Sequence, residues 1–439
     1  MKTIELFEYS KPMINLENFG FNTKTVKEFK SFLDEIWQIY KREKPRFWRE
    51  NTSEDDIDED IAIHQRFLYF DELKVKSRNY VGYIKYDDWE FKLYPKICPP
   101  SYNERGDLVN KNQIIKTVLL WLNYSNDLIL PNMLTGMEEI EDNDFIEILI
   151  RCFSKYTADL FSHSLYKHYV EVTEDTQFLK GKLNISDYIK NITLGKPHLF
   201  NCTYDSFELN NLFNKIVKFV SKSLLQITKN NQNKDYLSDI IKALDEVDDK
   251  YCTIQDCESV YINRFMGEFA VVLDYCKLFL NNSVSFIDGG NFENFAFLIR
   301  TETLFEDFIT NFSQQNIPEY KIVPQSKSYL DKSGVFGICP DLKIFDKKGK
   351  LIKVIDVKYK NVKSYDDITH SDIHQCVTYS KKLCCTDVVL LYPTFGENRK
   401  LEPIVIDDIN LSFKFIDNCT SPSSIETQII NIISDKNKN

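Results

Sequence analysis

Two aspartates stand near the ends of two short apolar runs in the segment CPDLKIFDKKGKLIKVIDVKYK, residues 339–360. Asp341 follows Pro340 at the start of the first run, and Asp356 lies near the end of the second. A carboxylate among apolar neighbours is costly unless it meets a cation or hydrogen-bond donors. If the two runs form a hairpin, the carboxylates approach each other at one end of it, where they repel. A divalent metal ion would remove this repulsion.

Lys358 belongs to the same predicted site, because residues two apart on a strand point to the same face. Its ammonium can orient or deprotonate a water molecule, while Mg²⁺ lowers the pKa of that water and neutralises charge on a phosphate. This combination is typical of metal-dependent phosphodiester hydrolysis. The alternative interpretation is a turn proline and a surface ion pair on a hairpin, because so loose a pattern recurs in unrelated proteins.

Four polar side chains in the predicted flanking helices extend the candidate site. Glu302 and Glu306 lie one helical turn apart before the hairpin, and a glutamate there can complete a metal shell. Gln375 and Tyr379 lie one turn apart after it. A glutamine can reach a phosphate or a metal-bound water, and a tyrosine can order the site or touch DNA. Taken singly, each of these residues is explained as well by a structural role.

This ordered set of residues resembles the PD-(D/E)xK nuclease superfamily in its branch with a QxxxY motif. More narrowly, LFEDFI, ICPDLKI, VIDVKYK, DIHQCVTY and VVLLYP resemble, in this order, the McrC family. Members of that family are the nuclease subunits of McrBC-type (5-methylcytosine or LlaJI-like) restriction systems. VGYIKYDDWEFKLYPKI resembles its N-terminal hairpin, and FLKGKLNISDYI with ELNNLFNKIVKFV resembles its middle. The resemblance therefore covers most of the chain.

The resemblance implies a role for each candidate residue. Mg²⁺, for which Mn²⁺ can substitute, would be bound by Asp341, Asp356 and Glu306. Lys358 would be the catalytic lysine, with Gln375 and Tyr379 as a supporting pair. Glu306 directly follows Leu-Phe, as in the family's pattern, and Glu302 stays the alternative helix carboxylate.

The resemblance also implies partners. They are double-stranded DNA and a McrB-like AAA+ GTPase hexamer, which the family contacts through its N-terminal region and stimulates. Cutting both DNA strands needs two active sites, so we also expect a homodimer through the nuclease domain. The chain has no G-x-x-x-x-G-K-[ST] loop, so we expect it to bind no nucleotide itself.

The hydrophobic periodicity predicts an α+β multidomain chain in three parts. Residues 1–110 form an N-terminal β-rich module, with a helix at 25–44 and a turn at Asp87-Asp88, and the resemblance implies that this module docks the partner. Residues 111–287 form a mostly helical middle region, in which 178–189 is extended. Residues 288–439 form an α/β core with elements in the order α, β, β, α, β, which the resemblance implies is the PD-(D/E)xK endonuclease domain.

Three details of this prediction can be checked separately in a structure. We expect one long helix over residues 291–312, and we place His163 and His168 on one helix, where a spacing of five is poor for two metal ligands. The acidic run at 54–60 favours a solvated loop over a cation site, because it has no glycine and no ordered ligand spacing.

The composition bears on the cellular compartment of the protein and on which region could contact nucleic acid. No apolar run is long enough to span a bilayer, and the N-terminus lacks a signal-peptide core, so we expect a cytoplasmic protein with no membrane contact. The 11 cysteines include no CxxC pair, which favours core thiols over disulfides or structural zinc. The net charge is −11, yet residues 335–400 hold twelve Lys and Arg against eight Asp and Glu, a local +4. This fits phosphate contact confined to one region, although a solvated charged face explains it as well.

The leading hypothesis is thus an Mg²⁺-dependent DNA endonuclease subunit of a GTP-driven, modification-dependent restriction system. A second hypothesis is a non-catalytic adaptor that assembles or activates a AAA+ ring and keeps the nuclease fold as a scaffold. A third is a stand-alone repair nuclease, which would cut without nucleotide or partner.

Overall fold

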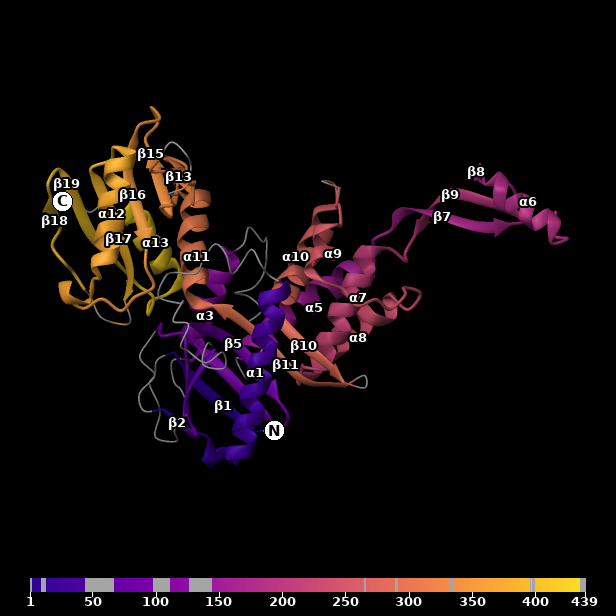
Figure 1. Cartoon of the computed structure of the whole chain (residues 1–439), viewed down its shortest axis with the longest axis horizontal. Coiled ribbons are helices and arrows are strands. Elements are labelled where there is room, and N and C mark those ends of the chain that lie inside the picture. The colour runs from indigo at the N-terminus through magenta and orange to yellow at the C-terminus, as the bar shows by residue number, and fades with distance from the viewer. Residues whose placement is uncertain are drawn as a thin grey trace. The chain divides into compact units, whose positions relative to one another are not determined.

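The structure is a computed structural model that describes residues 2–8, 13–43, 67–97, 111–125, 144–263, 266–288, 291–331, 335, 337–394, 396 and 399–434. The acidic run at 54–60 lies outside these residues. The chain forms two compact units (Figure 1). The first contains Met1–Leu149 and Asn282–Asn439, and the second contains Ile150–Asn281. The three-part division at 110/111 and 287/288 stays a prediction.

A five-stranded sheet organises the N-terminal part of the first unit. Its strands, in spatial order, are β1 (Lys2–Phe7), β6 (Trp89–Tyr94), β5 (Tyr80–Tyr86), β11 (Asn291–Arg300) and β10 (Ser283–Asp288). β1 runs parallel to β6, and the other neighbours are antiparallel. Asp87, with a φ of 48°, turns the chain between β5 and β6, so the hairpin predicted at Asp87-Asp88 is confirmed.

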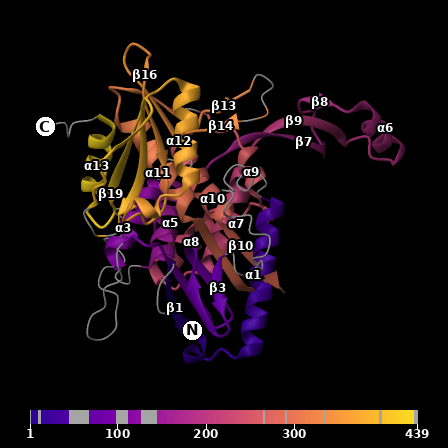
Figure 2. The same ribbon diagram turned by 60° about the vertical axis from the view of Figure 1, so that its left-hand side comes forward.

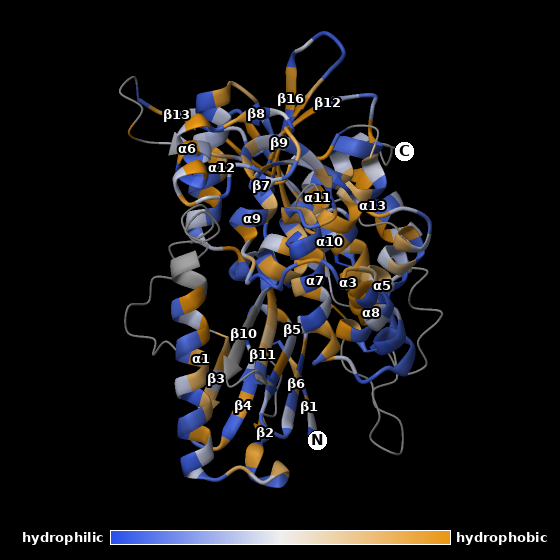
Figure 3. Cartoon of the chain, turned by 90° about the vertical axis from the view of Figure 1, so that its right-hand side faces the viewer, coloured by the Kyte–Doolittle hydropathy of each residue, from blue (hydrophilic) through white to orange (hydrophobic). Residues whose placement is uncertain are grey.

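A helix and a small sheet cover this five-stranded sheet. The helix α1 (Thr23–Glu43) confirms the helix predicted at 25–44, and hydrophilic and hydrophobic residues alternate along it (Figure 3). The small sheet has the order β2 (Ile14–Asn15), β4 (Lys74–Ser77), β3 (Leu68–Asp71), and the 3-10 helix η1 (Leu16–Phe19) follows β2. Residues 68–94 are thus β-rich, as predicted.

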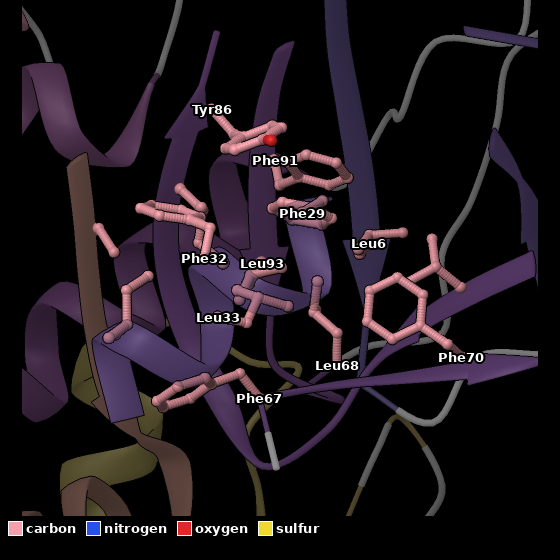
Figure 4. Packing of buried hydrophobic residues seen from close by; sticks show 14 of the residues in the cluster. Leu6, Phe29, Phe32, Leu33, Phe67, Leu68, Phe70, Tyr86, Phe91 and Leu93 are labelled. Carbon is pink, nitrogen blue, oxygen red and sulfur yellow. The ribbon is translucent and has the colours of Figure 1, made fainter. Parts of the chain in front are cut away.

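Aromatic packing joins α1 to the sheet. Phe29 of α1 is fully buried and stacks on Phe91 of β6 with ring centroids 4.6 Å apart, and Tyr86 lies 5.0 Å from it (Figure 4). Phe32 and Leu33, on the next part of the helix, are buried in the same cluster (Figure 4). Burial of these rings, rather than helix propensity, holds the long helix in place.

We predict that Phe29→Ala lowers the free energy of unfolding by about 3–5 kcal/mol, because it leaves a cavity among aromatic rings. Urea unfolding followed by circular dichroism would measure the loss. Lys24→Ala is the matched control on the same helix, since its side chain is 85% exposed and its removal should change stability by only about 0.5 kcal/mol. Equal stabilities of the two variants would contradict this account of the core.

The prediction of one helix over residues 291–312 is wrong for its first half. Residues 291–300 form β11, a central strand of the N-terminal sheet, and the helix α11 begins only at Thr301 and ends at Asn316. β11 pairs with β5 and β10 on its two sides, and its residues 295–300 are buried. A buried apolar run lacks the alternation that separates strands from helices. Pairing with strands from distant sequence therefore decides this segment.

The second unit is helical apart from one three-stranded sheet. Its helices are α5 (Phe145–His163, which starts in the first unit), α6 (Ile185–Thr193), α7 (Leu212–Leu225), α8 (Asn231–Ala243), α9 (Ile254–Glu258) and α10 (Gly267–Asn282). The sheet has the order β7 (His168–Thr176), β9 (Phe200–Glu208), β8 (Lys182–Leu183). The mostly helical character predicted for this region is confirmed.

Two details predicted for this region are wrong. His163 ends α5 whereas His168 begins β7, so the two histidines do not share a helix. Residues 178–189 are extended only in β8, and α6 begins at Ile185. The signal for α6 is its apolar positions at Ile185, Ile189 and Ile192, which fit one face of a helix.

A six-stranded mixed sheet forms the C-terminal part of the first unit. Its order is β12 (Lys321–Pro324), β15 (Leu342–Phe345), β16 (Leu351–Val357), β17 (Asp387–Thr394), β19 (Ile409–Asp417), β18 (Ile404–Ile406). The helices α12 (His370–Leu383) and α13 (Pro422–Ser434) lie on opposite sides of it (Figure 2). Also present are α3 (Lys111–Asn123), the pair β13 (Ser328–Tyr329) and β14 (Gly337–Ile338), and the 3-10 helix η6 (Tyr365–Asp367). The predicted order of helix, hairpin, helix and strand is confirmed.

The structure tests two predictions made from composition, that the cysteines are core thiols and that the chain has no membrane-spanning segment. In the part of the chain that the structure describes, nine cysteines are free, and seven of these are buried, as expected for core thiols. Cys419 is disulfide-bonded and is an exception to that expectation. Among the described residues, no helix combines the length and the apolar character needed to cross a membrane.

Candidate active site

The hairpin of β15 and β16 brings Asp341 and Asp356 to the same end of the sheet. Leu342 pairs with Ile355, so Asp341, just before β15, lies beside the end of β16 that contains Asp356. The Oδ2 atom of Asp341 accepts a hydrogen bond from the backbone N–H of Val357 at 2.7 Å. Asp356 is 1% exposed. The geometric prediction from the two apolar runs is therefore confirmed.

Lys358 provides the cation nearest to Asp356. Its Nζ atom lies 3.0 Å from Asp356 Oδ2, and its backbone N–H donates to the carbonyl of Leu391 on β17. Beyond this ion pair, Asp356 Oδ2 has no hydrogen-bond partner within the described ranges. The structure therefore leaves one buried carboxylate oxygen dependent on a single cation.

The two glutamates of α11 have different environments. Glu302 is engaged by its neighbours, because Arg300 Nη2 lies 2.9 Å from its Oε2 and Asn79 Nδ2 donates to its Oε1 at 3.1 Å. Glu306 lies one turn further along the helix, and the charge of Asp341 acts on its carboxyl. Of the two alternatives left open by the sequence, Glu306 is the one whose carboxyl feels the charges of both aspartates.

Gln375 and Tyr379 contact each other on α12. Gln375 Nε2 donates to Tyr379 Oη at 2.6 Å, and Tyr379 Oη donates to the carbonyl of Cys339 at 3.4 Å. Tyr379 is 2% exposed. The tyrosine therefore fixes the turn at Pro340 that presents Asp341, and its burial argues for ordering the site rather than for touching DNA.

Burial, and after it the charges of neighbouring groups, shifts the pKa values of the acidic groups. Burial, and then the charge of Asp356, raises the pKa of Asp341 to about 7. Burial and the charge of Asp341 raise the pKa of Glu306 well above its usual range. Burial also raises the pKa of Asp356, although Lys358 opposes this shift. For Lys358 itself, burial acts to lower the pKa, but the charges of Asp356 and Asp341 prevail and raise it. The lysine is therefore an ammonium ion.

The donor set fits a hard divalent cation. Carboxylate oxygens suit Mg²⁺ and Mn²⁺, and Mg²⁺ is usually held by one or two carboxylates together with waters and substrate phosphates. Asp341 and Asp356 supply two carboxylates, one of them with the under-satisfied buried oxygen. Within the described residues, no cluster of three His, Cys, Asp or Glu side chains is gathered for metal coordination. The residues thus fit a metal held by two aspartates more closely than a shell of three protein carboxylates.

One ion pair beside the site was not singled out from the sequence. Lys360 Nζ lies 3.1 Å from both carboxylate oxygens of Asp372, which also caps α12 together with Thr369. The Thr-x-x-Asp spacing at 369–372 is a readable capping-box signal. The pair with Lys360 has no such signal, because it depends on how α12 packs against β16.

The fold and the site together define a class: a mixed α/β protein with two neighbouring carboxylates, one of them buried, and a lysine at the end of a hairpin between two helices. The sequence model of the family described as McrBC 5-methylcytosine restriction system component matches residues 75–393. The chain belongs to this family. A comparison with curated proteins gave no match.

Two solved structures have a similar fold, and both come from Thermococcus gammatolerans. One is a refined half-complex from a tetradecameric assembly of McrB AAA+ hexamers with bound McrC. The similarity has a TM-score of 0.72 at 19% identity and covers 98% of this chain and 100% of that chain. The other is the McrBC complex determined by cryo-electron microscopy, with a TM-score of 0.53 at 20% identity, over 73% of this chain and 89% of that chain.

Proposed function

We propose that this chain is the Mg²⁺-dependent DNA endonuclease subunit of a McrBC-type restriction system, with a PD-(D/E)xK core. The observation that carries the proposal is the meeting of Asp341, Asp356 and Lys358 at one end of the β15–β16 hairpin. Three further residues, Glu306, Gln375 and Tyr379, come from the two helices that flank this hairpin. Membership of the McrBC family supports the same activity.

Each residue has a proposed role. Asp341 and Asp356 would hold the metal, which would polarise a phosphate oxygen and make a bound water more acidic. Glu306, whose carboxyl feels the charges of the aspartates, would support the metal site as a further carboxylate and could accept a proton from the attacking water. Lys358, as an ammonium ion, donates a hydrogen bond to the attacking water or to the scissile phosphate rather than removing a proton. Tyr379, held by Gln375, fixes the Pro340-Asp341 turn.

A cleavage assay tests this proposal directly. Modified duplex DNA is incubated with the chain, its GTPase partner, GTP and Mg²⁺, and the rate is compared with that of Asp356→Ala. Equal rates would refute the nuclease. Efficient cutting by the chain alone would instead support a stand-alone repair nuclease.

We further propose that a McrB-like AAA+ hexamer is the partner. This proposal is supported by the structure with the TM-score of 0.72, because it contains McrB AAA+ hexamers with bound McrC. The sequence resemblance implies docking through residues 1–110, which stays a prediction. In the described part of that range, Tyr69 is the single exposed large hydrophobic residue. The arm formed by β7, β8, α6 and β9 has more exposed large hydrophobic residues, because eight of them lie in 168–208.

The arm is therefore the better-supported docking surface. Within the second unit it extends away from α7 and α8 (Figure 1). On α6, Ile185, Ile189 and Ile192 are 66%, 53% and 45% exposed, although they form one apolar face. Apolar groups that gather on a surface in this way mark sites where another protein binds.

We predict that Ile189→Asp with Ile192→Asp reduces stimulation of the partner's GTPase about tenfold or more, because charges would have to be buried at the interface. GTP turnover measured against chain concentration would show this. Val405→Asp is the matched control, since Val405 is 73% exposed on β18. Unchanged stimulation by the α6 variant would return docking to residues 1–110.

A further inference from the structure

Glu8, just after β1, is a buried carboxylate that connects the N-terminal sheet to the candidate active site. It is 3% exposed. Its Oε2 atom accepts hydrogen bonds from Tyr359 Oη at 3.1 Å and from the backbone N–H of Lys96 at 3.2 Å. Its Oε1 atom lies 3.4 Å from Lys96 Nζ. Burial of a carboxylate is costly, so these contacts constrain all three residues.

Tyr359 is the residue directly after Lys358, and its ring is held from several sides. Lys96 Nζ lies 4.7 Å from the ring centroid, and the ring of Trp121 on α3 meets it edge-on at 6.0 Å. Phe305 on α11 lies 5.6 Å away. Tyr359 is 3% exposed, so its position is fixed by packing and by the bond to Glu8.

The same aromatic group also reaches the second element of the site. Phe305 is fully buried and directly precedes Glu306, while Trp121 packs on Phe305 with centroids 5.2 Å apart. Tyr359 and Phe305 are thus in ring contact, and each is covalently next to a candidate site residue. A displacement of Tyr359 would therefore shift Lys358 and Glu306. Small displacements of reacting groups lower the rate of catalysis strongly.

We propose, on the basis of the nuclease function proposed above, that Glu8 is a positioning residue for cleavage. Through Tyr359 it holds Lys358, and through the contact of Tyr359 with Phe305 it holds Glu306. The N-terminal sheet thereby sets the geometry of the cleavage site. A contact between residues 351 positions apart in sequence makes this dependence possible.

The test compares Glu8→Ala, Glu8→Gln and Tyr359→Phe in the full chain. Glu8→Ala should lower the cleavage rate at saturating DNA about tenfold or more, in the presence of the GTPase partner and GTP, and leave the half-saturating DNA concentration within about twofold. Glu8→Gln keeps an acceptor oxygen for Tyr359 and should restore most of the rate. Tyr359→Phe keeps the ring and should lose rate in the same direction as Glu8→Ala.

Glu5→Ala is the matched control. Glu5 lies on β1 and also has a lysine and a tyrosine hydroxyl as partners, Lys111 at 3.2 Å and Tyr94 at 3.4 Å, but neither partner is next in sequence to a candidate site residue. Its thermal stability should fall by less than that of Glu8→Ala, because the Glu5 side chain is 31% exposed, and its cleavage rate should stay near wild type. An equal loss of rate in Glu5→Ala, or an unchanged rate in Glu8→Ala, would overturn the proposal.

Hydrogen exchange keeps this inference separate from the nuclease itself. Measured by mass spectrometry on the metal-free chain, exchange in residues 351–361 and 301–310 should be faster in Glu8→Ala than in wild type and unchanged in Glu5→Ala. If wild type does not cleave DNA, the nuclease proposal fails, yet faster exchange in Glu8→Ala alone still supports positioning. Unchanged exchange in Glu8→Ala overturns positioning whatever the cleavage result.

Discussion

Asp356→Ala is expected to abolish DNA cleavage while the chain still stimulates its GTPase partner. The variant removes the more buried of the two proposed metal ligands and leaves the Lys358 ammonium without its 3.0 Å partner. Lys358→Ala removes a positive charge aimed at a phosphate that gains negative charge, so it should lower the cleavage rate by about 10²–10³-fold. Gel analysis of DNA products alongside GTP turnover would measure both activities in one reaction.

Two further variants make this first result interpretable. Asp356→Asn keeps the shape of the side chain, so a loss of cleavage in a folded Asn variant excludes a simple packing defect. Asp366→Ala, at an exposed carboxylate in the same part of the chain, should cleave like wild type. Cleavage by Asp356→Ala and Lys358→Ala at the wild-type rate would remove the nuclease from consideration.

The hairpin could be predicted because its information is local. Asp341, Asp356 and Lys358 lie within 18 residues, and strand alternation alone puts the last two on one face. Gln375 and Tyr379 are one helical turn apart, and the structure places them in contact. Local spacing of this kind needs no knowledge of the tertiary fold.

What could not be predicted depends on contacts between distant segments. The sequence pattern predicts a helix where β11 lies, because the pairing of β11 with β5, more than 200 residues earlier, leaves no local signal. The hydrogen bond from Tyr359 to Glu8 also has no signal in the sequence. The choice between Glu302 and Glu306 also depends on a distant residue, since Asn79 donates a hydrogen bond to the carboxylate of Glu302. The sequence thus predicted which residues form the hairpin, whereas the supports around it came from the fold.

The alternative function, a non-catalytic adaptor for a AAA+ ring, differs from the nuclease most sharply in metal binding. An adaptor has no use for two carboxylates that repel each other at the end of a hairpin. The repulsion is visible in the pKa of Asp341, which burial and the charge of Asp356 raise to about 7. A bound divalent cation would stabilise both charged forms at once.

We therefore expect Mn²⁺ to bind the wild-type chain in a calorimetric titration and Asp341→Ala to weaken that binding about 100-fold or more. Because a raised pKa means that Asp341 holds its proton to higher pH, binding must release that proton. The apparent affinity should then fall as the pH is lowered from about 8 to about 6. Asp366→Ala should bind Mn²⁺ like wild type. A wild-type chain that binds no Mn²⁺ would favour the adaptor, whereas Asp341-dependent, proton-linked binding fits the nuclease and gives the buried carboxylates their counter-ion.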